Sequence, residues 1–241
     1  MFTCAQCRSH ARFPLTADTT TSIARYLRLE DVWRASFSCR AAVRPWRVAL
    51  FREFSRRMQS RLARARLPAV PRELGALVGG CVAQVLLDET WPDSDFDYVA
   101  ATRDVHGALV DAIMIHNPLL IADREPAAFV GPMREGEREF LELTAYHDGL
   151  KTCKLSDLDG NVRVDVITLS QTGLRDKTIE DLLEGFDLTC CQCGWDGAEL
   201  TIMFPGLLFA RRMRVQAGVW RNSARAAARA NKYMGRGFKF Q

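Results

Sequence analysis

The sequence has no run of eighteen apolar residues, so it offers no candidate for a membrane-spanning helix. Its first stretch, MFTCAQCRSH, lacks the apolar segment of a signal peptide. Histidine is scarce, with 4 residues scattered along the chain, and none stands in a pattern that suggests a catalytic partner. These absences predict an intracellular protein of the cytoplasm or nucleus, with no membrane contact, whose 8 cysteines are thiols rather than disulfides.

Acidic residues are missing from one end of the chain and scarce at the other. Residues 1–66 hold 14 Lys/Arg against 4 Asp/Glu, and residues 206–241 hold 9 against none, whereas residues 67–205 hold 10 against 25. These basic segments on both sides of an acidic middle have two interpretations. They contact nucleic acid, or they attract the acidic middle within a single fold.

The first quarter of the chain has helical rather than strand character. Ile23, Tyr26 and Leu27 follow a Thr/Ser-rich cap at helical spacing, a second segment begins near Glu30, and a third runs from about Pro45 to Arg66. The stretch LPAVPREL, with two prolines, then marks a boundary. We therefore expect a small helical domain over residues 1–68 and a second domain over residues 69–241.

The second domain has the mixed pattern of an α/β fold. We expect a mixed sheet with helices mainly on one side, in which residues 161–170 place Val162, Val164 and Val166 on one face and Asp165 on the other. The expected strands span residues 93–100, 138–148, 150–157 and 161–170, the helices span 104–117 and 178–186, and a hairpin spans 187–204 with its turn at Asp196-Gly197. The Arg/Ala-rich tail is expected to be helical up to Gly235.

Three aspartates alternate along WPDSDFDYVA, which occupies residues 91–100. In an extended chain Asp95 and Asp97 point the same way, ~7 Å apart, and their like charges repel unless a cation lies between them. A surface turn that begins at Pro92 accounts for such a stretch. A divalent metal also accounts for it, because Mg²⁺ takes carboxylate oxygens together with substrate phosphates.

Two further motifs accompany SDFDY: the glycine turn LVGGC at residues 77–81 and the strand VRVDVI at residues 162–167. Together they resemble the DNA polymerase β-like nucleotidyltransferase superfamily. The resemblance implies that Asp95 and Asp97 are Mg²⁺ ligands and that Asp165 is the third carboxylate, a base for the attacking hydroxyl. It also implies that Gly79 and Gly80 cradle the phosphates of a nucleoside triphosphate, with Gly80 or Cys81 at a position where the family has Gly or Ser.

The resemblance extends over about residues 74–240 to a nucleotidyltransferase-like family of large DNA viruses and fungi. The matching stretches are QVLLDETWPDSDFD, FDLTCCQCGWDG and KYMGRGFKF. Membership of a viral family would place the protein in the host cell or the virion. It also implies that Tyr233 and Phe238 dock the tail onto the core, and that Phe186 and Leu188 pack inside while Asp187 lies on the opposite side of its strand.

Residues 13–57 resemble an F-box more loosely, through a proline near the start, three short helical segments and a Trp. An F-box presents an apolar surface to a ubiquitin-ligase adaptor, which would then be a partner. The alternative is a generic three-helix appendage. The arginines from Arg40 to Arg66 form either a solvated face or a nucleic-acid contact.

The cysteines allow one partial metal motif. Cys4, Cys7 and His10 have the spacing of half a zinc site. In CCQC, strand alternation would bury Cys191 and Cys193 as small apolar residues, with Cys190 on the other face.

Two functions of different classes remain open from the sequence. The first is Mg²⁺-dependent transfer of a nucleotidyl group from a nucleoside triphosphate to a hydroxyl of a nucleic acid, protein or small molecule. The second is a catalytically degenerate nucleotidyltransferase fold that serves as a binding, adaptor or virion-assembly module. Intact Asp95, Asp97 and Asp165 favour the enzyme, whereas the lack of an evident substrate-binding Lys or Arg near them favours the module.

Overall fold

The computed structural model describes residues 16–37, 40–69, 72–100, 103–122, 151–168, 179–215 and 224–241. The chain divides into two compact units, one of Met1–Arg61 with Gln84–Thr90 and one of Leu62–Ala83 with Trp91–Gln241. The expected strand at residues 138–148 and the trio Cys4, Cys7 and His10 lie outside the described residues. Within those residues, no helix combines the length and the apolar character needed to cross a membrane.

The smaller unit is helical, as the sequence predicts. It contains α1 (Ala17–Ala24), α2 (Leu29–Ala35) and most of α3 (Arg40–Arg64). Thr16 caps α1 by accepting a hydrogen bond from the backbone N–H of Thr19 at 3.1 Å. Helix α3 begins at Arg40, which is earlier than expected. Pro45, the expected start, therefore lies inside the helix. Fully buried side chains from all three helices form the core of this unit: Ala24, Leu29, Val32, Ala49, Phe54 and Met58.

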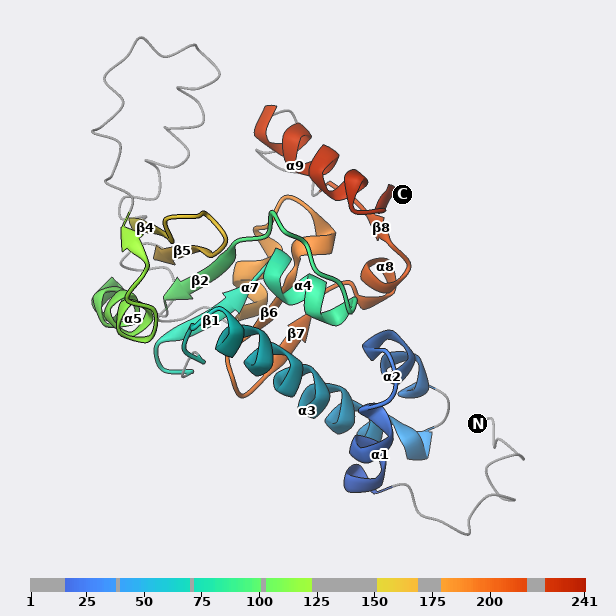
Figure 1. Cartoon of the computed structure of the whole chain (residues 1–241). Coiled ribbons are helices and arrows are strands. Elements are labelled where there is room, and N and C mark those ends of the chain that lie inside the picture. The colour runs from blue at the N-terminus through green and yellow to red at the C-terminus, as the bar shows by residue number, and fades with distance from the viewer. Residues whose placement is uncertain are drawn as a thin grey trace. The chain divides into compact units, whose positions relative to one another are not determined.

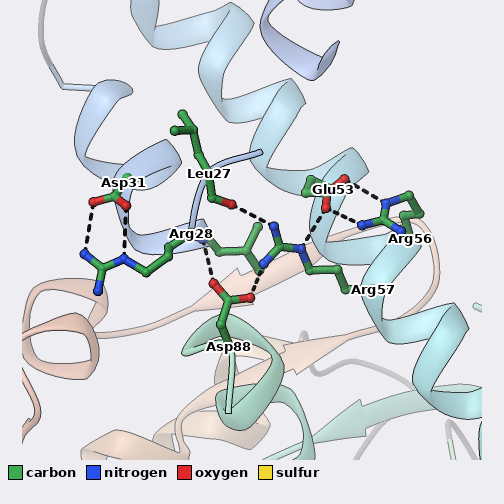
Figure 2. A network of polar contacts seen from close by, with 8 residues as sticks. Leu27, Arg28, Asp31, Glu53, Arg56, Arg57 and Asp88 are labelled. Atoms are coloured by element: carbon green, nitrogen blue, oxygen red, sulfur yellow. Dashed lines mark hydrogen bonds and ion pairs between the residues drawn. The ribbon is translucent and has the colours of Figure 1, made fainter. Parts of the chain in front are cut away.

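A buried acid organises the polar contacts of this unit (Figure 2). Glu53 is 1% exposed and accepts hydrogen bonds from Arg56 and from Arg57, the latter at 2.7 Å. Arg57 also donates to the carbonyl of Leu27 and contacts the carboxylate of Asp88. Asp88 in turn accepts from the backbone N–H of Leu29. These contacts fix α3 against the start of α2 and against the segment Gln84–Thr90.

The larger unit is built on a mixed seven-stranded sheet (Figure 1). Its strand order is β3-β4-β5-β2-β1-β6-β7. Strands β2 (Phe96–Ala100) and β5 (Arg163–Thr168) run parallel, and every other neighbouring pair is antiparallel. The remaining strands are β1 (Gly75–Val78), β3 (Ile121–Ala122), β4 (Lys151–Ser156), β6 (Cys193–Trp195) and β7 (Leu200–Ile202). The expected α/β class is therefore confirmed.

The two faces of the central strands differ in their side chains, as strand alternation requires. Val164 and Val166 of β5 are fully buried, whereas the intervening Asp165 is partly exposed. On the face that bears Asp165, residues of β1 and β2 pack with α7 (Ile179–Glu184) in a small apolar cluster around Val78, Val99 and Leu183. Helix α5 (Arg103–His116) packs against β2 and β5, where His106 Nε2 lies 3.2 Å from the carbonyl oxygen of Val166.

The hairpin expected over residues 187–204 is shorter than the sequence predicts. Strands β6 and β7 pair across a turn that contains Asp196-Gly197, but Thr189–Cys191 form a 3₁₀ turn instead of a strand. Thr189 holds this turn through its N–H to Arg214 O at 3.1 Å and its hydroxyl to Arg214 N–H at 2.9 Å. Because strand alternation is lost here, Cys190 is buried together with Cys191 and Cys193.

The C-terminal segment packs through aromatic rings, as the sequence predicts. It contains α8 (Pro205–Phe209), β8 (Arg212–Met213), α9 (Ala224–Gly235) and β9 (Lys239–Phe240), with β8 and β9 paired in a separate two-stranded sheet. Tyr233 and Phe238 are 4% and 2% exposed, and both rings meet the ring of Trp91 edge to face. Trp91 directly precedes the aspartate motif, so these contacts fix α9 near that motif.

Candidate active site

A cavity of about 470 Å³ opens where the glycine turn, the aspartate strands and α9 meet within the larger unit. Its lining includes all three aspartates predicted from the sequence, Asp95, Asp97 and Asp165. The turn contributes Gly79 and Gly80, the segment after α7 contributes Phe186 and Asp187, and α9 contributes Arg229, Lys232, Tyr233 and Arg236.

The parallel pairing of β2 and β5 brings two of the carboxylates together. Asp97 and Asp165 are register partners on these adjacent strands, and therefore project from the same face of the sheet. Asp95 precedes β2 by one residue and lines the same cavity. The turn follows β1, whose Val78 is the register partner of Asp97 on the other side.

This grouping makes Asp97 electrostatically unusual. Burial raises the pKa of Asp97, and the charges of Asp165 and Asp95 raise it further, to about 7, although Arg229 opposes the rise. Among the residues that the structure describes, Asp97 forms no ion pair. A cation placed among the three carboxylates would therefore lower this repulsion.

The other two carboxylates already have basic partners. Asp95 Oδ1 lies 3.0 Å from Nε of Arg163, and Asp165 Oδ2 lies 3.7 Å from Nζ of Lys154. In this arrangement the described side chains include no ready-made group of three metal ligands. The aspartates thus share one cavity, but two of them are turned toward neighbouring cations.

The glycine turn closely approaches two side chains of the cavity lining, Asp97 and Tyr233. Gly79 has a positive φ of +75°, which glycine adopts without strain, and a Cβ there would lie 3.4 Å from Asp97 Oδ2. A Cβ at Gly80 would come within 2.9 Å of the Tyr233 hydroxyl. Cys81 follows in α4 (Gly80–Leu86), is fully buried, donates its S–H to the Val78 carbonyl, and does not line the cavity. Its thiol therefore does not take the place of a phosphate-binding serine.

Asp93, the first aspartate of the motif, has a different role from Asp95 and Asp97. Asp93 Oδ1 accepts a hydrogen bond from Arg236 at 2.6 Å, and Lys232 Nζ lies 3.3 Å from Asp93 Oδ2 while donating to the Asp93 carbonyl at 2.7 Å. Burial raises the pKa of Asp93, but the hydrogen bond and charge of Arg236 and the charge of Lys232 lower it more, so the net pKa is below its usual value. Asp93 thus anchors α9 beside the cavity.

A second acid, Asp187, anchors the same helix. Asp187 is 4% exposed, and its Oδ1 lies 2.8 Å from Nη1 of Arg229. Nη2 of Arg229 lies 3.8 Å from the thiol of Cys191. Burial raises the pKa of that thiol, but contacts with Cys190, Arg229 and Tyr233 lower it more, to about 7. Asp187 and Phe186 both line the cavity, and neither lies in a strand, so the expectation of a strand with these two side chains on opposite sides is wrong.

The basic side chains of α9 are the part of the site that sequence reasoning missed. The sequence shows no substrate-binding Lys or Arg close to Asp95 and Asp97, because the cations of α9 lie more than 130 residues further along the chain than this motif. Their spacing gave a signal, because residues 229, 232, 233 and 236 share one helical face. Four-residue spacing also places Arg221, Arg225 and Arg229 on one face of a helical tail, but of these three side chains the structure describes Arg229 alone.

The chain was compared with known proteins. No family model matches it, and no curated protein sequence matches it. Among solved structures it is similar to the Thermotoga maritima CCA-adding enzyme complexed with tRNA, with a TM-score of 0.44 and 19% identity over 80% of this chain and 39% of that one. It is also similar to a CCA-adding enzyme in apo form I, with a TM-score of 0.39 and 18% identity over 82% of this chain and 40% of that one. For apo form II the TM-score is 0.44 and the identity 16%, over 78% and 40% of the two chains. The chain thus spans about two fifths of the length of each of these proteins.

Proposed function

We propose that the cavity catalyses Mg²⁺-dependent transfer of a nucleotidyl group from a nucleoside triphosphate to a hydroxyl acceptor. The observation that carries this proposal is the register pair of Asp97 and Asp165, which faces one cavity with Asp95 beside a glycine turn. Nucleotidyl transfer depends mainly on positioning and charge neutralisation, so it needs clustered carboxylates next to a surface that admits phosphates. The sequence motifs that resemble the nucleotidyltransferase superfamily supply this same set.

The carboxylates fit magnesium by their chemistry. Mg²⁺ prefers carboxylate oxygens and needs only one or two of them together with substrate phosphates. The raised pKa of Asp97 reflects its burial and the negative charges of Asp165 and Asp95, a repulsion that a divalent cation relieves. Asp95, Asp97 and Asp165 would hold the ion, and Asp95 and Asp165 would exchange Arg163 and Lys154 for it. When bound, Mg²⁺ supplies positive charge to the phosphate oxygens during transfer.

The chain itself provides the remaining functions. Gly79 and Gly80 admit phosphate oxygens close to the backbone, since neither carries a Cβ. Asp165 accepts the proton of the attacking hydroxyl. Ile167 and Phe186 give the cavity an apolar wall against which a base or ribose can pack.

The test is a transfer assay with the full chain, Mg²⁺ and each α-labelled nucleoside triphosphate, offered RNA, DNA and protein acceptors. We expect label transfer by the wild type and a loss of roughly a hundredfold or more in Asp97→Asn and Asp165→Asn, as for groups that act on the transition state. Asp111→Asn, an exposed aspartate on α5, is the matched control and should transfer normally. Equal transfer by all four proteins, or transfer by none, would contradict the proposal.

A second candidate is a nucleotidyltransferase-like fold that binds without turnover. It is favoured by the ion pairs of Asp95 and Asp165 and by the lack of a converged three-ligand group among the described residues. Nucleotide binding of equal affinity with and without Mg²⁺, combined with no label transfer, would establish this candidate over the first.

The helical unit adds a possible adaptor role to the second candidate. Ile23, Tyr26 and Phe37 are 42%, 90% and 57% exposed, which is the kind of apolar surface that an F-box presents to a ubiquitin-ligase adaptor. Purified adaptor should then bind the wild type and lose affinity for a Tyr26→Ser Phe37→Ser variant. An interaction unaffected by these substitutions would argue against an F-box.

A further inference from the structure

The cavity has more acids than a nucleotide site can use without compensation. Five aspartates lie in or beside it, and a triphosphate is itself a polyanion that these charges repel. Cations at the cavity wall must therefore offset the repulsion. Three of the four cations in the lining come from α9, and these three are not equivalent in their surroundings.

Arg236 and Lys232 serve the anchoring of α9. The Arg236 side chain is 8% exposed, its guanidinium lies over the ring of Trp91 at 4.3 Å and near the ring of Tyr233 at 4.8 Å, and Asp93 accepts its hydrogen bond. Lys232 is tied to both the carboxylate and the carbonyl of Asp93. Both side chains hold the helix against the motif, Arg236 through Nη2 and Lys232 through Nζ.

Arg229 has a different geometry. Its side chain is 38% exposed, while the partner on which it rests, Asp187, is 4% exposed. The guanidinium thus extends from a buried carboxylate toward the open cavity. An arginine carries five N–H donors in a planar fork, and the contacts of Nη1 with Asp187 and of Nη2 with the Cys191 thiol use two of them.

From this geometry we propose that Arg229 is the residue that binds the polyphosphate of the substrate, and that Asp187 is the positioning residue that presents it. The assignment rests on the proposed nucleotidyl transfer and specifies which side of the cavity receives the phosphates, namely the α9 wall. A buried carboxylate fixes the rotamer of a long side chain that would otherwise lose entropy on binding. Bidentate Arg–phosphate contacts are among the strongest charge-assisted hydrogen bonds.

The experiment measures binding by calorimetry in Mg²⁺ without an acceptor. The four ribonucleoside triphosphates are compared first, followed by the diphosphate, monophosphate and nucleoside of the tightest binder. We expect Arg229→Gln to weaken triphosphate binding roughly tenfold to a hundredfold, as for the loss of a charge-assisted hydrogen bond. Nucleoside binding should stay within about twofold of wild type, within the ordinary scatter of such contacts. Arg212→Gln, an exposed arginine of β8 outside the cavity lining, is the matched control.

Asp187 is tested through its dependence on Arg229. Asp187→Asn should weaken triphosphate binding, and the double variant Asp187→Asn Arg229→Gln should bind no more weakly than Arg229→Gln, because Asp187 acts through the arginine. The double variant also removes both charges together, so no buried charge is left alone. Arg229→Lys keeps the charge without the fork and should bind with intermediate affinity.

The outcomes separate this inference from the proposed function. Equal triphosphate affinities of wild type and Arg229→Gln, or equal losses for triphosphate and nucleoside, would overturn the role of Arg229. Additive losses in the double variant would overturn the role of Asp187. A wild type that binds no triphosphate would overturn both the inference and the proposed function. Phosphate-dependent losses without any label transfer would support the inference and contradict transfer alone.

Discussion

Three aspartates at alternate positions have two different roles at the scale of single residues. Asp95 and Asp97 line the cavity with Asp165, whereas Asp93 holds Arg236 and Lys232 of α9. A sequence pattern treats the three as equivalent, because alternation describes only the direction of a side chain. The difference arises from the partner that each carboxylate meets in the folded chain.

The first prediction concerns Asp97 in the metal-free protein. Burial and the charges of Asp165 and Asp95 raise its pKa from 3.8 to about 7, so the folded state holds the proton more tightly than the unfolded state. The contribution of Asp97 to stability is then fully present below pH ~4 and is lost as the pH rises through 7. Wild type should lose roughly 3 kcal/mol between pH 5 and pH 8.5, and Asp97→Asn should lose much less.

Urea unfolding of both proteins in chelator at several pH values measures this difference. Addition of Mg²⁺ at pH 8 should restore stability to the wild type and leave Asp97→Asn unchanged, since binding to the folded state stabilises it. Identical pH profiles for the two proteins would show that folding does not raise the pKa of Asp97.

The residues of the site differ in how far the sequence reveals them. Asp95, Asp97, Asp165 and the two glycines stand in short motifs whose geometry follows from strand alternation and from turn chemistry. Asp187 and Arg229 stand 42 residues apart, and only tertiary packing brings them within 2.8 Å. No local pattern encodes such a pair, so the sequence could not assign either residue to the cavity.

At the scale of elements, the aspartate motif also fixes the C-terminal helix. Asp93→Asn removes the charge that Arg236 and Lys232 share, and α9 should then open more often, although Tyr233 and Phe238 stay packed on Trp91. Hydrogen exchange of the α9 amides should be faster by roughly threefold to tenfold, as expected for the loss of about 1 kcal/mol of an exposed charge network. Exchange in α5 provides an internal control, because Asp93 forms no contact with it in the described structure. Unchanged exchange in α9 would mean that the aromatic contacts suffice.

The helical unit depends on one buried acid for its internal order. Burial raises the pKa of Glu53, but hydrogen bonds from Arg56 and Arg57 lower it more, so the net pKa lies below 4.5. The stability that Glu53 contributes is therefore present above its ordinary pKa and is lost as the pH falls through its lower folded value. Glu53→Gln should destabilise this unit by roughly 3 kcal/mol at pH 7, because Arg56 and Arg57 would lose their buried partner.

Thermal unfolding followed by circular dichroism tests this expectation at pH 7 and pH 4. The control is Asp18→Asn, whose carboxylate also pairs with an arginine of α3 but is 91% exposed and should contribute little. Similar melting temperatures for the two variants would show that burial of Glu53 does not matter.

The elements themselves followed from the sequence wherever local chemistry decides them. Helices α5 and α7 and strands β2, β4 and β5 were predicted from periodicity and capping, whereas α1 lies earlier than expected, because the Thr/Ser-rich stretch forms the helix itself and Tyr26 and Leu27 follow it. The 3₁₀ turn at Thr189–Cys191 was not, because the backbone of Arg214 takes the hydrogen bonds that a neighbouring strand would have taken. Periodicity likewise does not encode the position of β2 between β1 and β5, because strand order depends on pairing between segments that are distant in the sequence.

At the scale of the whole molecule, the charge partition is partly explained by internal pairing. Arg229, Lys232 and Arg236 of the basic tail bind aspartates of the acidic middle. This supports mutual attraction for the C-terminal end. The N-terminal end differs, because nine arginines from Arg40 to Arg66 accompany a single acid, Glu53, which is buried.

The last prediction assigns nucleic-acid contact to α3. Arg44, Arg47 and Arg64 are exposed on this helix, whereas Arg52 and Arg56 pair with Asp18 and Glu53. Replacing the three exposed arginines by Gln should weaken the binding of unrelated RNA and DNA sequences to a similar extent. The slope of log affinity against log salt should flatten by roughly 0.7 to 0.9 for each phosphate contact that is lost. Arg52→Gln is the control and should flatten it less for the single charge that it removes, because Asp18 already pairs with this arginine. Fluorescence anisotropy between 50 and ~300 mM salt measures both slopes. If the triple variant and the wild type gave the same slope, α3 would be a solvated face, and the acceptor of the proposed transfer would have to be sought among molecules without a phosphate backbone.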